Sequence, residues 1–137
     1  MTKIIIASVL FISSLLSAQN VTLTVSISDL KNDTGTVQVG LFNSEGTFLK
    51  SIYQGISSDI KSKSAVVTFL NIPKGVYAIS AYHDKNKNGK LDMNFIGIPK
   101  EAFACSNNAK GLMGPPKYAE AKFILNKDAK IEIKFNN

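Results

Sequence analysis

Alternation of apolar and polar residues is the dominant recurring pattern beyond residue 20, and this period of two predicts β-strands. The clearest case is the run from Val21 to Ser28, in which every second residue is aliphatic. Similar patterns predict strands at Thr36–Phe42, Ala65–Leu70, Val76–His83, Tyr118–Leu125 and Ala129–Phe135. We expect the first two strands to form a hairpin, and the last two to pair around Asn126–Asp128.

Short strands separated by turn residues, without an amphipathic helix pattern, indicate an all-β fold. We therefore expect an antiparallel β-sandwich of about seven strands, forming a single domain over residues 20–137. Thr47–Tyr53 fits either a short helical turn or an irregular crossing. Asn94–Lys117 is rich in Gly, Pro, Asn and Ser and has no clean period. Such a long irregular segment is typical of a binding loop, or of one partly ordered by a ligand.

The N-terminal residues have the composition of a secretory signal. Lys3 precedes an apolar run of about thirteen residues, Ile4–Leu16, and small residues follow at Ser17 and Ala18. This predicts a signal peptide over residues 1–18, cleaved near Ala18 or Gln19. A permanent anchor is the alternative, but the run is shorter than the roughly 20 residues that a membrane-spanning helix needs. We expect a periplasmic or extracellular protein whose mature form has no transmembrane segment.

Charge and cysteine content narrow the function classes. The chain has 16 basic and 10 acidic residues, a net charge of +6, and every basic residue is lysine. Nucleic-acid readers depend on the planar fork of arginine, and these lysines are spread along the sequence, so we expect no nucleic-acid binding. Cys105 and His83 are the only residues of their types, which excludes an internal disulfide. A Cys–His nucleophile built from this pair is the less favoured alternative to an inert thiol.

The stretch from Asp84 to Asp92 has the residue types of a calcium-binding loop. Oxygen-bearing side chains stand at alternate positions, followed by a glycine and a further acid, as in EF-hand and dockerin-like loops. The predicted ligands of a structural Ca²⁺ are Asp84, Asn86, Asn88, the carbonyl of Lys90, and Asp92. Phe95 stands where an EF-hand has its bidentate glutamate, so a further oxygen is needed from Asn94, Glu101 or Asn107. The alternative is an ordinary hairpin turn, which Asn88-Gly89 alone favours.

The segment after this loop combines apolar side chains with amides. Amides beside aromatic faces suit carbohydrate or peptide recognition. The candidate ligand-binding residues are His83, Phe95, Glu101, Asn107 and Asn108. Alternatively, the apolar residues cover one end of the sandwich and the amides satisfy backbone groups.

Two functions follow from these features. The first is an exported, non-catalytic binding or envelope-structural domain with a calcium loop, whose partner is a glycan, a peptide or an envelope protein. The alternative is a carbohydrate-active or other small hydrolase that uses Asp84, Asp92 and Glu101, since glycoside hydrolysis needs two carboxylates across the scissile bond. A cation in the loop would occupy the same oxygens, which favours the first function.

The residues from Gly75 to Asp92 resemble the signature of the bacterial domain of unknown function 2141 family. The resemblance continues through Asn94–Glu101, Ser106–Ala109 and Gly114–Pro116, and it covers most of the chain beyond the predicted signal. It implies a small exported domain built as a transthyretin- or immunoglobulin-like sandwich. It implies no particular activity or substrate.

Overall fold

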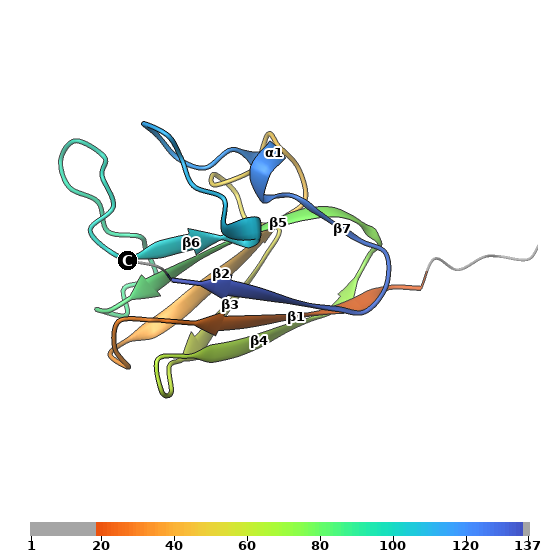
Figure 1. Cartoon of the computed structure of the whole chain (residues 1–137), viewed down its shortest axis with the longest axis horizontal. Helices are drawn as coiled ribbons and strands as arrows, with labels where there is room; N and C mark the ends of the chain where they lie inside the picture. The colour runs from red at the N-terminus through yellow and green to blue at the C-terminus, as the bar shows by residue number, and fades with distance from the viewer. Residues whose placement is uncertain (1–18, 136–137) are drawn as a thin grey trace, which may run out of the picture.

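Eight strands form two sheets that pack face to face in a computed structural model describing residues 19–135 (Figure 1). The strands are β1 (Val21–Ser28), β2 (Thr36–Phe42), β3 (Gln54–Asp59), β4 (Ala65–Ile72), β5 (Gly75–Asp84), β6 (Phe103–Cys105), β7 (Phe123–Leu125) and β8 (Ala129–Lys134). The expected all-β sandwich is therefore confirmed, with eight strands rather than about seven. The predicted signal peptide, residues 1–18, lies outside the described residues.

The two sheets differ in size and in pairing. The smaller has the order β4-β1-β8, and the larger has the order β3-β2-β5-β6, with β7 pairing separately against β5. All pairs are antiparallel except β1 with β8, which run parallel with Val25 opposite Ile131. The sandwich is thus mostly, rather than wholly, antiparallel.

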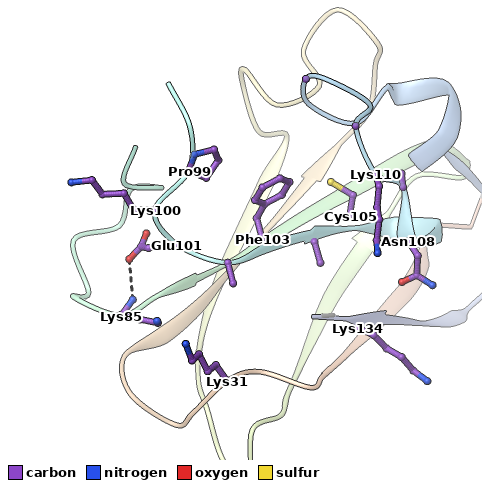
Figure 2. A pocket seen from close by; sticks show the side chains of 15 residues that line it. Lys31, Lys85, Pro99, Lys100, Glu101, Phe103, Cys105, Asn108, Lys110 and Lys134 are labelled. Carbon is purple, nitrogen blue, oxygen red and sulfur yellow. Dashed lines mark hydrogen bonds between the residues drawn. The ribbon is translucent and has the colours of Figure 1, made fainter. Parts of the chain in front are cut away.

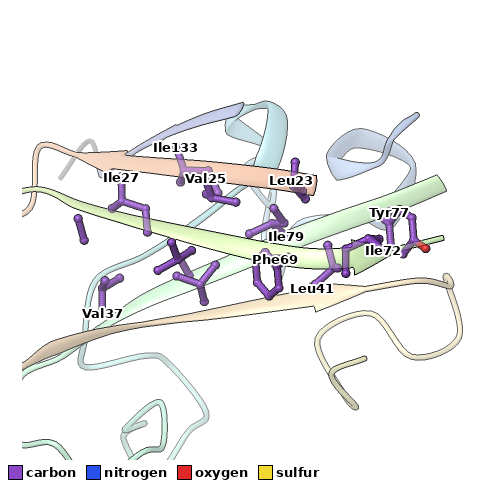
Figure 3. Close-up of a cluster of buried hydrophobic side chains, with 14 of the residues drawn as sticks. Leu23, Val25, Ile27, Val37, Leu41, Phe69, Ile72, Tyr77, Ile79 and Ile133 are labelled. Atoms are coloured by element: carbon purple, nitrogen blue, oxygen red, sulfur yellow. The ribbon is translucent and has the colours of Figure 1, made fainter. Parts of the chain in front are cut away.

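The core lies between the inner faces of the sheets, as the period-two pattern requires (Figure 3). On β1, Leu23, Val25 and Ile27 are buried, while the residues between them are partly exposed. On β5, Ile79 and Ala81 are buried on the same inner side of the larger sheet. Burial removes each of these aliphatic side chains from water, and this stabilises the folded state by about 1.5–3 kcal/mol per side chain.

The predicted hairpin between Val21–Ser28 and Thr36–Phe42 is wrong. β1 pairs with β4 and β8, whereas β2 pairs with β3 and β5. The connection over residues 29–35 crosses from one sheet to the other, and its Leu30 is buried in the core. An alternating pattern identifies the buried face of a strand but not its partner, and these two strands bury their apolar faces from opposite sheets.

The predicted pairing of Tyr118–Leu125 with Ala129–Phe135 is also wrong. Tyr118–Ala121 forms one helical turn, α1, which buries Ala121. Only Phe123–Leu125 is a strand, and it pairs with the start of β5, while β8 joins the other sheet. The short connection after β7 therefore changes sheets instead of making a tight turn.

Two further segments depart from the sequence-based expectations. β3 was not predicted, because its sequence of one glycine, one isoleucine and four polar residues lacks the usual alternation of branched side chains. The segment Asn94–Lys117 is not wholly irregular, since it contains β6 and a single 3₁₀ turn, η1 (Ser106–Asn108). The connection between β2 and β3 consists of turns around the buried Phe48. Of the two alternatives for Thr47–Tyr53, this is nearer to the short helical turn than to an irregular crossing.

Gly35 provides a test of how the sheet-to-sheet connection meets the end of β5. It has a φ of +78°, and a Cβ at this position would overlap the Asp84 carbonyl and lie 2.7 Å from Lys85 Cα. We expect Gly35→Ala to lower the free energy of unfolding by about 2 kcal/mol or more, because it adds left-handed strain to a backbone overlap. Urea unfolding followed by circular dichroism measures this.

Gly46→Ala is the matched control, because a Cβ there meets nothing within 4 Å and its φ lies outside the left-handed region. Its stability is expected to change by less than about 1 kcal/mol. Equal unfolding midpoints for the two variants would contradict the close approach of Gly35 to β5.

Candidate functional site

Asp84 ends β5, and its carboxylate organises the loop that follows. The side chain is fully buried. Its Oδ1 accepts the Asn88 N–H at 3.1 Å, and its Oδ2 accepts the Gly89 N–H at 2.8 Å and the Gln38 amide at 3.3 Å. Gly89, with a φ of +73°, turns the chain at this point. Three N–H donors thus compensate the buried carboxylate, and the same bonds fold the loop back onto β5.

Glu101 closes the other end of the loop. Its carboxylate is buried, and it accepts the Lys85 N–H and the Asp92 N–H, each at 3.1 Å. A backbone bond from Lys100 to the Asp92 carbonyl, at 2.7 Å, reinforces this closure. Glu101, predicted as a candidate ligand-binding residue, therefore ties the two ends of the Asp84–Asp92 loop together.

The remaining predicted calcium ligands lie in the same loop and bond to one another. The Asn86 and Asn88 amide nitrogens donate to the two Asp92 carboxylate oxygens, at 2.7 and 2.8 Å. Their amide oxygens accept the N–H groups of Asn88 and Lys90, at 3.3 and 3.0 Å. Over residues 19–135, no group of three or more His, Cys, Asp or Glu side chains is arranged to hold a metal ion. The loop is closed by hydrogen bonds, with amide nitrogens facing Asp92.

Tyr82 lies just before this loop, within the electrostatic reach of its carboxylates. Burial raises the pKa of Tyr82, and the charges of Asp84, Glu101 and Asp92 raise it further. The phenol therefore keeps its proton at neutral pH and is available as a hydrogen-bond donor. The three carboxylates act on one hydroxyl although they do not form a metal-binding cluster.

His83 and Cys105 lie on opposite faces of the larger sheet. His83 is fully buried, and its Nε2 lies 2.6 Å from the Thr34 carbonyl oxygen. Cys105 pairs with Ser80, whose side chain faces the other way along β5, and it packs with Phe42. Burial raises the pKa of the Cys105 thiol to about 11, so the thiol is protonated at neutral pH. This arrangement favours the inert thiol over a Cys–His nucleophile.

The other candidate ligand-binding residues do not gather in one place. Asn107 donates its amide to the carbonyls of Glu120 and Lys122, at 3.1 and 2.8 Å, and so ties η1 to α1. Asn108 lines a separate pocket beside β6, and Phe95 is fully exposed. Asn107 therefore fits the alternative in which amides satisfy backbone groups.

An open groove of about 1390 Å³ lies over the outer face of the larger sheet. Three connections rise on this side of the molecule and wall it: the β2–β3 turns, the β5–β6 loop, and the segment before α1 (Figure 1). Four strands provide its floor, which consists of Gln38, Val39, Gly40, Gly55, Ile56, Ser57, Ser80, Tyr82 and Phe103. Sequence patterns did not reveal this groove, because its walls come from segments distant in the chain.

Two glycines on the floor of the groove make room for the Ile52 side chain. Gly40 of β2 lies opposite Gly55 of β3, and Ile52 lies across both of them. A Cβ on either glycine would stand 2.8 Å from an Ile52 methyl carbon. Gly40, at an outward position of the predicted strand Thr36–Phe42, is a sequence feature from which a close approach here could have been predicted, although it was not.

Apolar side chains on the groove walls are unusually exposed. Met93, Ile96, Ile98 and Met113 are each more than half exposed, and all four line the groove. Scattered exposed aliphatics are common on proteins, but a cluster of them around a concave surface marks an interaction site. The polar floor groups, Gln38, Ser57 and Tyr82, can orient a ligand by hydrogen bonds.

These features define a small all-β sandwich with a loop-walled groove on one face. The chain belongs to the family described as "Uncharacterized protein conserved in bacteria (DUF2141)", whose sequence model matches residues 25–134. This match confirms the resemblance seen in the Gly75–Pro116 motifs. Neither the curated proteins nor the solved structures include a match to the chain. Within residues 19–135, no helix has the length and apolar character to cross a membrane.

Proposed function

We propose that this protein is an exported, non-catalytic binding domain that holds an extended apolar ligand in the groove over the larger sheet. The observation that carries the proposal is the cluster of exposed Met and Ile side chains along the groove walls. A glycan site needs a dense set of polar partners, whereas this lining is mainly apolar, which favours an apolar ligand over a carbohydrate.

The same geometry weighs against the hydrolase alternative. Asp84 and Glu101 are buried, and their oxygens already accept backbone N–H groups that hold the loop. Asp92 accepts two side-chain amides. A glycosidase needs two carboxylates that face a substrate from either side, and these carboxylates instead serve the loop itself.

Export rests on the signal-like composition of residues 1–18. We expect cells that express the full chain to yield a mature protein that begins at Gln19 or Asn20 in the periplasmic or culture fraction. Fractionation followed by intact-mass measurement checks this. A full-length chain confined to the cytosol would contradict export.

A substitution that places a charged side chain on one wall of the groove tests whether the ligand binds there. Nile red, an uncharged dye whose emission depends on its surroundings, serves as the probe. We expect Ile96→Asp to weaken dye binding by at least about tenfold, because burying an isoleucine against a ligand contributes about 1.5–3 kcal/mol. A fluorescence titration of the mature protein measures the dissociation constant.

Leu70→Asp is the matched control, since Leu70 and Ile96 are both 64% exposed and Leu70 lies on β4, outside the groove. It should bind the dye as the parent protein does. The groove is excluded as the site if the two variants lose affinity equally, or if the parent protein does not bind the dye.

We also propose that the Asp84–Asp92 loop binds a structural Ca²⁺. Support comes from the oxygens of Asp84, Asn86, Asn88 and Asp92, which share one loop with the Lys90 carbonyl. The ion would replace the two amide donors that now contact Asp92, and each amide oxygen keeps a second lone pair for it. Two carboxylates are few for such a site, so the affinity belongs to the weak extracellular range of about 10⁻⁴–10⁻³ M.

Thermal unfolding after chelation tests the calcium proposal. We expect about 10 mM Ca²⁺ to stabilise the mature protein by about 1–3 kcal/mol, which raises Tm by several degrees, and Mg²⁺ to do much less. Asp92→Ala should abolish the rise, while Asp59→Ala, a change at an exposed β3 position, should retain it. An unchanged Tm of the parent protein at this calcium concentration would sink the proposal.

A further inference from the structure

A second pocket, of about 570 Å³, lies beside β6 and is surrounded by lysines (Figure 2). Its basic residues are Lys31, Lys85, Lys100, Lys110 and Lys134, which come from four separate segments of the chain because Lys85 and Lys100 share the β5–β6 connection. Glu101 is the only acidic residue in the lining, and backbone N–H groups already bond to its carboxylate. The fold thus brings lysines that are spread along the sequence to the lining of one pocket, and in Figure 2 the side chains of Lys100 and Lys134 extend outward from it.

The edge of β6 adds backbone donors to this pocket. β6 is the outermost strand of the larger sheet and pairs only with β5. His83 N–H bonds to the Ala102 carbonyl, and the antiparallel alternation then directs the peptide groups of Ala104 toward β5 as well. The N–H groups of Phe103 and Cys105 are therefore turned away from β5, at residues that line the pocket. The carbonyl oxygens of Phe103 and Cys105 face the same way, so the suitability of this pocket for an anion rests mainly on its ammonium groups.

The lysine pocket and the apolar groove adjoin each other. Pro99, Phe103 and Gly114 line both of them. Phe103 stands on β6 between the two, with 39% of its surface exposed, and Figure 2 shows its ring among the lysine-bearing segments. One ligand can therefore lie in the groove and extend its charged end past Phe103 into the pocket.

We propose that the ligand of this protein is a single phosphorylated lipid, with its apolar chain in the groove and its phosphate among the lysines. The inference rests on groove binding as proposed above and adds the chemical class of the ligand. A phosphate carries up to two negative charges and several acceptor oxygens, which lysines bind as point charges without the planar fork that arginine offers. The positive charge of the lysines selects a negatively charged headgroup, and the apolar walls of the adjoining groove select the hydrocarbon chain of the lipid.

The test compares two molecules with the same chain, decyl phosphate and 1-decanol, as competitors of Nile red in the mature protein. Decyl phosphate is expected to compete more strongly, and its advantage should shrink as salt screens the lysines. Lys31→Gln combined with Lys110→Gln should reduce that advantage by roughly three- to tenfold, as expected for two exposed ion pairs, and leave competition by 1-decanol unchanged. Lys61→Gln combined with Lys130→Gln, which changes the net charge equally at exposed positions outside both pockets, should leave both competitors unchanged.

Each other outcome has a definite meaning. Equal competition by the two molecules in the parent protein overturns the phosphate assignment and leaves the groove intact. Failure of Nile red and of both competitors to bind overturns the groove together with this inference. Calorimetry compares the binding of inorganic phosphate with that of decyl phosphate. If both bind equally tightly, the pocket is a site for free phosphate and the assignment of a lipid ligand is overturned. If both double variants lose the same part of the advantage of decyl phosphate over 1-decanol, that advantage comes from the net charge of the protein. The lysine pocket is then not the phosphate site.

Discussion

The rest of this site depends on the hydrogen bonds that the buried carboxylate of Asp84 accepts. It lies at the last residue of β5, where the strand leaves the sandwich, and it is fully buried without a lysine in its hydrogen-bond shell. N–H donors from Gln38, Asn88 and Gly89 stabilise its charge, since an uncompensated carboxylate in the interior would cost several kcal/mol. Because two of these donors belong to the loop, satisfying the carboxylate also sets the direction of the chain. The groove wall built by Leu91–Pro99 starts from that direction.

Period-two alternation was a reliable guide to which residues face the core, and a poor guide to which strands pair. Val21–Ser28 was predicted with its observed bounds, and its aliphatic residues are buried as expected. Its pairing with β4 and β8 was not predictable, because any strand with one apolar face can join either sheet. β3 was missed because it is an edge strand, and only its pairing with β2 makes it regular.

The sequence located the Asp84–Asp92 loop, since Asp, Asn and Gly at set spacings form hydrogen bonds with neighbours along the chain. Local hydrogen bonds of this kind depend on few distant residues. Glu101 was predicted as an additional calcium ligand, as a ligand-binding residue or as a hydrolase carboxylate. Its role in closing the loop was not predicted, because it depends on β6 returning beside β5. Asn94–Lys117 was predicted as a candidate binding loop and supplies part of the groove wall, but neither the shape of the groove nor the lysine pocket was predicted. Both are made by segments that meet only after the two sheets have formed, and lysines scattered in sequence carry no sign of the pocket they share.

The loop and the groove share their backbone, and this links whatever each of them binds. Glu101 is bonded to the loop through Lys85 and Asp92, and it also lines the lysine pocket. Any ion that pulled Asp92 inward would move the start of the groove wall, and any ligand that fixed the wall would restrict the loop. Linkage requires this effect to be reciprocal, so an ion that tightens ligand binding must itself be held more tightly when the ligand is present. If the proposed ion and ligand both bind, the shared backbone makes the stability of the loop one of the determinants of ligand affinity.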